Sequence, residues 1–148
     1  MKKGQVKKNK GMRVATRESR TLFIRNLPEV LDFRTLYSLF ELYGPIKSVY
    51  TDGLMARGTM HLTYYDLRHA VAALNGLNTM EFGGRIMLIL YGTFFDNESE
   101  TLVVSNECGV ERFGAVRQRK SVDGGAVCIE YYDLRALDCA RNFEKRNS

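Results

Sequence analysis

The chain has 148 residues, enough for one complete domain and part of a second. Hydrophobic residues make up 45% of it, an ordinary share for a protein that buries a core. No apolar run approaches the roughly 20 residues of a membrane-spanning helix, and no apolar segment follows the basic N-terminus as it would in a secretory signal. We therefore expect neither a membrane protein nor a secreted one.

The net charge of +5 is concentrated at the N-terminus. Residues 1–20 carry eight basic side chains and one acidic one, residues 21–92 carry six of each, and residues 93–148 carry eight basic and ten acidic. Because the first segment has no hydrophobic periodicity, it is predicted to be a basic disordered tail. Clustered lysines and arginines favour phosphate backbones, but such runs are equally typical of nuclear targeting.

The three cysteines, Cys108, Cys128 and Cys139, form no CxxC pair and have no histidine cluster near them. This spacing favours reduced thiols over a disulfide or a zinc site. We therefore expect no metal site, and we expect a reducing compartment, the nucleus and/or the cytoplasm.

Within residues 21–92, strand-like and helix-like patterns alternate. Apolar residues recur at helical spacing after Asp32 and again after Asp66, and both aspartates are suitable N-caps. The predicted order is strand, helix, strand, strand, helix, strand over residues 21–26, 33–43, 46–50, 57–64, 67–74 and 85–91. This βαββαβ order predicts an α+β, ferredoxin-like fold, in which two helices cover one face of a four-stranded antiparallel sheet and leave the other face open.

Alternation along the strands predicts which side chains point to the open face. The residues expected to point outward from the first and third strands are Phe23, Arg25, Arg57, Thr59, His61 and Thr63. Phe23 is a large aromatic residue on a face meant for solvent, which favours a stacking platform for a base. The alternative is a contact for a protein partner, or a tolerated surface residue.

The last strand is predicted to present a second feature on the open face. Met87, Ile89 and Tyr91 alternate along it, and we interpret them as an outward apolar stripe. Exposure of such an apolar stripe to water is unfavourable, so another surface is expected to pack on it.

Two segments resemble the RNP motifs of RNA-recognition motifs (RRMs). Residues 22–27 (LFIRNL) resemble the hexamer, and residues 57–64 (RGTMHLTY) resemble the octamer in the Arg-Gly opening, the apolar sixth place and the final aromatic. The resemblance implies that Phe23 stacks on a base and that Arg57 contacts phosphate. The octamer's third and fifth places are usually aromatic. Here they hold Thr59, which cannot stack, and His61, which either stacks or is a solvated strand residue without a role.

The second half of the chain repeats the first. TLVVSN at 101–106 matches TLFIRN at 21–26, and CIEYYDLRALDCA at 128–140 matches HLTYYDLRHAVAA at 61–73, so YYDLR occurs twice. Residues 19–143 resemble the first and second RRMs of the Mei-two-like meiotic RNA-binding proteins.

The second repeat is incomplete. Seventeen positions separate Asn26 from Tyr43, but only seven separate Asn106 from Phe113, so most of a first helix is missing. Val103 stands where the first repeat has Phe23. We predict an acidic linker at 93–100 and, at 101–148, a degenerate partial RRM that lacks the first helix and the last strand. Being too small to bury a full core alone, it is expected to pack on the first RRM.

The leading hypothesis is binding of single-stranded RNA with modest sequence selectivity. The candidate RNA-binding residues are Phe23, Arg25, Asn26, Arg57, Thr59, His61, Met87, Ile89 and Tyr91. The alternative is a protein-interaction module whose sheet face contacts a protein partner. No paired carboxylate, nucleophile elbow or phosphate loop accompanies the two histidines. We therefore expect no enzyme, no catalytic residue, no cofactor and no small-molecule substrate.

Overall fold

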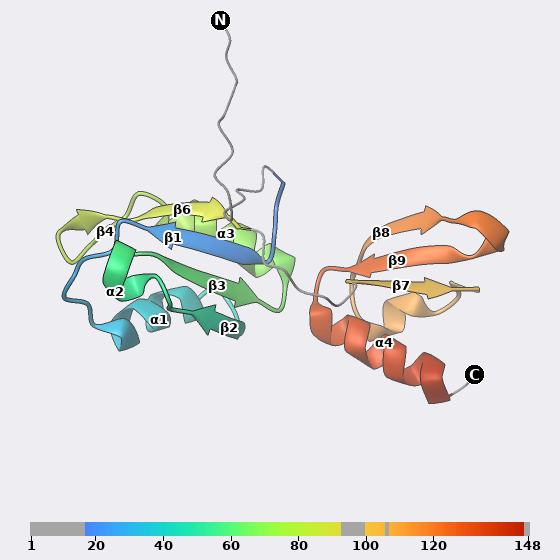
Figure 1. Cartoon of the computed structure of the whole chain (residues 1–148). Coiled ribbons are helices and arrows are strands. Elements are labelled where there is room, and N and C mark those ends of the chain that lie inside the picture. The colour runs from blue at the N-terminus through green and yellow to red at the C-terminus, as the bar shows by residue number, and fades with distance from the viewer. Residues whose placement is uncertain (1–16, 93–99, 106, 147–148) are drawn as a thin grey trace, which may run out of the picture.

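A computed structural model describes residues 17–92, 100–105 and 107–146 of the chain. These residues form two α+β units that lie side by side (Figure 1). Most of the expected basic tail at 1–20 and acidic linker at 93–100 lies outside the described residues. In the described part of the chain, no helix is long and apolar enough to cross a membrane.

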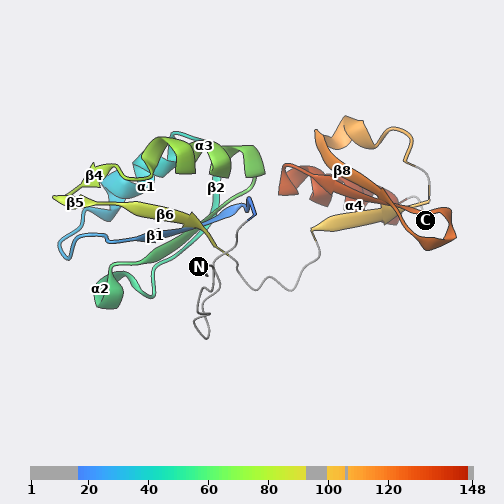
Figure 2. The same ribbon diagram turned by 90° about the horizontal axis from the view of Figure 1, so that it is seen from above.

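The first unit is a four-stranded antiparallel sheet in the order β2-β3-β1-β6. Figure 2 shows α1 and α3 on one side of this sheet. The elements are β1 (Thr21–Arg25), α1 (Phe33–Glu41), β2 (Ile46–Tyr50), α2 (Leu54–Arg57), β3 (Met60–Tyr64), α3 (Leu67–Leu77), β4 (Glu81–Phe82), β5 (Arg85–Ile86) and β6 (Leu88–Tyr91). The predicted α+β fold with two helices on one sheet face is confirmed, while α2 and the β4–β5 hairpin are additions.

Both long helices of the first unit begin where the sequence indicated. The Asp32 carboxylate accepts a hydrogen bond from the Thr35 backbone N–H, and the Asp66 carboxylate accepts one from the Arg68 N–H, so each satisfies a donor that has no partner within the helix. The apolar faces of α1 and α3 then pack on the sheet. The buried residues of this core include Leu22, Ile24, Leu36, Phe40, Met60, Leu62, Tyr64, Ala70, Ala73, Met87 and Ile89.

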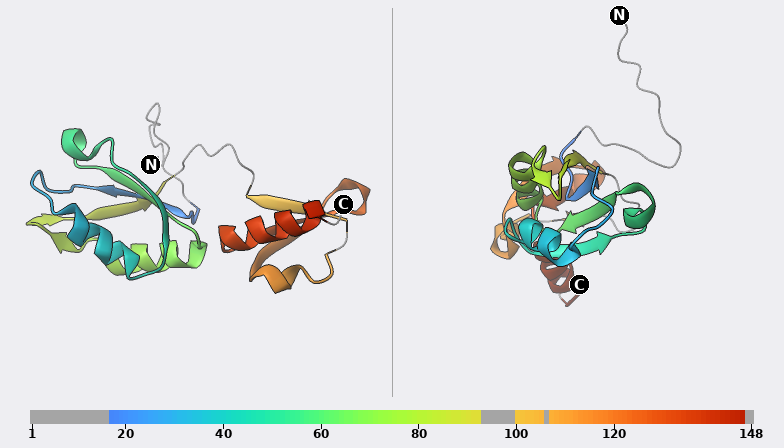
Figure 3. Two further views of the ribbon diagram at one scale, coloured as in Figure 1. Left: turned by 90° about the horizontal axis from the view of Figure 1, so that it is seen from below. Right: turned by 90° about the vertical axis from the view of Figure 1, so that its left-hand side faces the viewer.

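The second unit is a three-stranded sheet with one long helix packed along it (Figure 3). Its elements are β7 (Thr101–Val104), η1 (Val110–Phe113), β8 (Val116–Ser121), η2 (Asp123–Gly125), β9 (Val127–Tyr131) and α4 (Leu134–Arg146). The four-residue 3₁₀ helix η1 occupies the chain position of α1, as the short spacing before Phe113 indicated. A separate core holds this unit together, formed by Val104, Val110, Ile129, Tyr131, Ala136, Leu137 and Ala140.

The strands of the two sheets pair in the same register. In both units the strand pair carries a bulge at the same place, between Ile46 and Ser48 in the first and between Val116 and Gln118 in the second. Tyr64 and Tyr131 end the matching strands β3 and β9, and both are fully buried. Each residue of the second sheet can therefore be compared with its partner position in the first.

Candidate nucleic-acid interface

Phe23 and His61 form a stacked pair on the sheet face away from α1 and α3. They are Cα partners on β1 and β3, and their ring centroids lie 4.7 Å apart with an interplanar angle of 26°. Phe23 does not belong to the helix-side core, which agrees with its predicted outward direction. However, its exposed fraction is only 4%, so the expectation of a solvent-facing ring is wrong.

The pair belongs to a row that crosses all four strands. Tyr50 of β2 is the Cα partner of His61, and Leu90 of β6 is the Cα partner of Phe23. Directly opposed residues of an antiparallel pair share one face, so Tyr50, His61, Phe23 and Leu90 form what we call the aromatic row. Tyr50 is 53% exposed and is the ring of this row most open to solvent.

Sequence reasoning missed Tyr50 and Leu90. Tyr50 is the last residue of β2, and the bulge between Ile46 and Ser48 changes the alternation before it. An alternation count along β2 alone therefore cannot assign its face. The signal that could have found Tyr50 was its place opposite His61 once the two strands were paired.

His61 presents a neutral ring to this face. Burial lowers the pKa of His61 below its ordinary value of 6.5, because the charged imidazolium is disfavoured away from water. At pH 7 the side chain therefore acts as an aromatic surface and not as a cation that could pair with phosphate.

The predicted apolar stripe on the last strand is wrong in its direction. Met87 and Ile89 are 0% and 2% exposed and lie in the helix-side core, and Tyr91 is half-buried against that core. The outward positions are Leu88 and Leu90, the Cα partners of Arg25 and Phe23. Both alternating sets on this strand are apolar, so hydrophobicity could not decide the face.

Arg57 and Thr59 are not in a strand. Arg57 is the exposed last residue of α2, and β3 begins only at Met60. Gly58 ends that helix in the left-handed conformation, with φ 64°, as glycine commonly does after a helix. A Cβ on Gly58 would also lie 2.7 Å from the Leu27 carbonyl oxygen. The Arg-Gly pair is thus a helix ending, and Arg57 is not a residue of the sheet.

Asn26 is held by hydrogen bonds within the protein, whereas the Arg25 side chain is exposed. The Asn26 side-chain amide donates to the Ile86 carbonyl at 2.8 Å, and its oxygen accepts from Arg85 Nε at 3.2 Å. Asn26 therefore ties the end of β1 to the β4–β5 hairpin, a structural role that the sequence did not indicate. Arg25 is exposed at the end of β1, beside the aromatic row.

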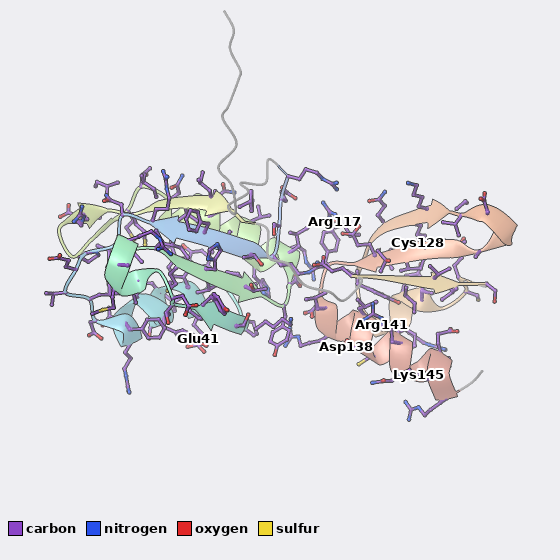
Figure 4. The ribbon with its side chains drawn as sticks, in the orientation of Figure 1. Glu41, Arg117, Cys128, Asp138, Arg141 and Lys145 are labelled. Carbon is purple, nitrogen blue, oxygen red and sulfur yellow. The ribbon has the colours of Figure 1, made fainter. Side chains whose placement is uncertain are left out.

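The second unit carries no aromatic ring at the matching positions. Lys120, Cys128 and Val103 are Cα partners across β8, β9 and β7, in the register of Tyr50, His61 and Phe23. Val103 is 58% exposed. On the same sheet, Arg117 donates to the Glu130 carboxylate at 2.7 Å. Figure 4 labels Arg117 and Cys128 on this sheet. This face offers charge and a thiol but no stacking surface.

Metal chemistry has no support among the described residues. No group of three or more His, Cys, Asp or Glu residues there could hold a metal ion. Cys108 and Cys139 are exposed, Cys128 is half-buried, and none of the three forms a disulfide.

Known proteins are similar in sequence to this chain, including the strands that form the open face. Residues 22–88 match the family model of the RNA recognition motif. Protein MEI2-like 5 of Oryza sativa subsp. japonica is 35% identical over 140 residues, and the alignment covers 82% of this chain but only 17% of that protein. Meiosis protein mei2 of Schizosaccharomyces pombe is 34% identical over 64 residues, covering 43% of this chain and 8% of that protein. Among solved structures, the Sex-lethal RNA recognition domains 1 and 2 from Drosophila melanogaster share 18% identity and a TM-score of 0.45, covering 82% of this chain and 90% of that one.

Proposed function

The chain belongs to the RNA recognition motif family and is close in sequence to the MEI2-like proteins, and we propose on this basis that it binds single-stranded RNA through the open face of its first unit. The role is binding without catalysis. The bases would stack on the aromatic row, and Arg25 at the end of β1 and Arg57 at the end of α2 would contact phosphates. The lysines and arginines of residues 1–20 would add electrostatic attraction.

The main support for the proposal is the aromatic row. Tyr50, His61 and Phe23 place three rings on adjacent strands, on the sheet face away from the helices. Stacking on aromatic side chains is tolerant of sequence because every base has a π-face. With few polar groups on the row to read base edges, modest sequence selectivity follows.

Tyr50→Ala tests the proposal most cleanly, because Tyr50 is 53% exposed and lies outside the helix-side core. Stability should change by no more than about 0.5 kcal/mol, as for a surface site. Affinity for a labelled random-sequence single-stranded RNA should fall by about 1–3 kcal/mol, the usual contribution of one base stack. Fluorescence anisotropy titration at two salt concentrations measures this loss.

The matched control is Phe33→Ala, which removes a 37% exposed aromatic residue of α1. It should leave RNA affinity unchanged, because α1 covers the opposite face of the sheet. If Tyr50→Ala binds RNA as tightly as Phe33→Ala, the open face does not bind RNA by stacking.

A second candidate function is supported by the burial of Phe23. At 4% exposure, with Leu88 and Leu90 beside it on the open face, Phe23 offers little ring surface to a base. A face of this kind also suits a protein partner. Under this alternative, Tyr50→Ala would weaken capture of a protein and leave RNA titrations unchanged.

A further inference from the structure

The two copies of YYDLR, residues 64–68 and 131–135, meet at the junction of the two units. The Leu67 N–H donates to the Tyr132 carbonyl at 3.0 Å, and the Leu134 N–H donates to the Tyr65 carbonyl at 2.9 Å. Asp66 and Asp133 form an antiparallel β-bridge between these bonds. Each contact thus has its mirror in the other repeat, which is the pattern of an interface with two-fold symmetry.

The arginines of the two motifs also make symmetrical contacts with the opposite unit. The Arg68 guanidinium lies 4.8 Å from the centroid of the Tyr132 ring, and the Arg135 guanidinium lies 4.9 Å from that of the Tyr65 ring. Each arginine also makes an ion pair with the aspartate of its own motif, at 2.7 Å for Arg68 and 2.6 Å for Arg135. Both guanidinium groups are therefore held in place to stack across the junction.

Only part of the motif is needed within each unit. The Tyr64 and Tyr131 hydroxyls donate to the carbonyls of Phe40 and Val110 inside their own units. Asp66 and Asp133 accept from backbone N–H groups at the starts of α3 and α4.

The remaining contacts of the motif are made across the junction. The rings of Tyr65 and Tyr132 lie under the arginines of the opposite unit. The first N–H groups of α3 and α4, at Leu67 and Leu134, have no acceptor within their helices and are satisfied by the other unit.

The second unit keeps this motif while the aromatic row changes completely. It has YYDLR unaltered, yet Lys120, Cys128 and Val103 stand where the first unit has Tyr50, His61 and Phe23. The shared residues are those at the junction, and the changed residues are those of the candidate RNA face. This contrast separates the motif from any role in stacking bases.

One pair of residues at the junction breaks the symmetry. Arg20 precedes β1, and Glu100 precedes β7 at the matching position of the second repeat. Arg20 is 6% exposed, pairs with the Glu100 carboxylate, and donates to the carbonyls of Tyr131 and Tyr132. Pairing two first units would place two arginines here, and pairing two second units would place two glutamates.

We propose that YYDLR is a self-complementary docking surface whose partner is the second copy of the same motif, and that the Arg20–Glu100 ion pair selects the union of a first unit with a second unit over two like units. Like charges opposed at a junction disfavour the wrong pairing. The second unit then serves to bind the first. This inference does not depend on what the open face binds.

Amide hydrogen exchange of the full chain, followed by NMR, tests the docking. The Leu67 and Leu134 N–H groups are the readout because their acceptors lie in the opposite unit. Arg20→Glu, and separately Glu100→Arg, should speed exchange at both amides at least tenfold, while the core amides of Leu62 and Ile129 stay protected. The swap Arg20→Glu with Glu100→Arg should exchange more slowly than Arg20→Glu alone, because both variants lack the hydrogen bonds from Arg20 to the Tyr131 and Tyr132 carbonyls and only the swap has opposite charges facing each other.

Two outcomes of these measurements on Arg20 and Glu100 overturn the proposal. Single variants that exchange at Leu67 and Leu134 within twofold of the wild type would show that the ion pair does not hold the junction. A swap that exchanges as fast as Arg20→Glu alone would show that charge does not select the pairing. Arg34→Ala, which removes an exposed arginine of α1, is the control and should change neither amide.

A second variant covers the case in which Arg20→Glu disturbs β1 and core protection is lost. Arg68→Gln with Arg135→Gln alters two side chains that are 54% and 50% exposed, so both units should stay folded. Loss of both stacked guanidinium groups should again speed exchange at Leu67 and Leu134. Unchanged exchange in this variant, with the core amides protected, would likewise overturn the proposal.

Discussion

Replacing Phe23 with alanine should destabilise the first unit strongly, although the residue lies on the face opposite the helices. Phe23 is 4% exposed and stacks on His61 with 4.7 Å between ring centroids. Changes of buried phenylalanine to alanine in closed cores cost roughly 3–5 kcal/mol. Because Phe23 packs outside the main core, against His61 and Leu90, we expect a loss of about 2–3 kcal/mol, at or below the lower end of that range.

Thermal melting followed by circular dichroism measures this loss. In a domain of this size each kcal/mol corresponds to about 4–8 °C in Tm, so Phe23→Ala should lower Tm by about 8–24 °C. The matched control is Val103→Ala, at the same register position of the second unit and 58% exposed, which should change stability by about 0.5 kcal/mol at most.

A Tm that falls by less than about 3 °C in Phe23→Ala would refute the reasoning, because it would mean that the ring is not packed as its burial indicates. RNA titration of the same sample measures its RNA affinity as well. A loss of affinity much larger than that of Tyr50→Ala would show that Phe23 itself contacts a base.

Two further predictions concern the second unit and the histidine of the aromatic row. Residues 97–148 expressed alone should melt at a lower temperature than the second unit does in the full chain, because one long helix on three strands buries a small core and the contacts with the first unit are lost; an equal melting temperature would contradict this. The pKa of His61 is lowered by burial in the folded chain, so the unfolded chain binds the proton more tightly and the free energy of unfolding should decrease as pH falls below about 6.5. His61→Gln should remove this part of the pH dependence, and identical pH profiles for the variant and the wild type would argue against it.

The sequence was sufficient to predict what depends on periodicity within one element. The βαββαβ order, the aspartates that begin the helices and the outward direction of Phe23 all follow from local patterns. The short spacing before Phe113 likewise indicated that the second unit has only one turn in place of its first helix.

The errors arose where an element's face depends on its neighbours. Met87 and Ile89 could not be assigned because the alternative set, Leu88 and Leu90, is equally apolar. The prediction of a strand that begins at Arg57 is wrong, because Gly58 ends a helix there and the strand begins only at Met60. The resemblance of residues 57–64 to the octamer favoured a strand over this helix ending. Tyr50 required the pairing of β2 with β3, which is a property of the folded sheet and not of either segment.

The position of Arg20 in the chain has a consequence for how the protein is made. Its carbonyl acceptors lie 111 and 112 residues further along the sequence, whereas the first sheet is complete once Tyr91 has been synthesised. Domains generally fold as units and from the N-terminus during synthesis. The first unit therefore folds with this guanidinium still hydrated, and water is removed from it only when the second repeat leaves the ribosome. A pause in translation between the two repeats would prolong the time in which the docking surface of the first unit is exposed to water without its partner.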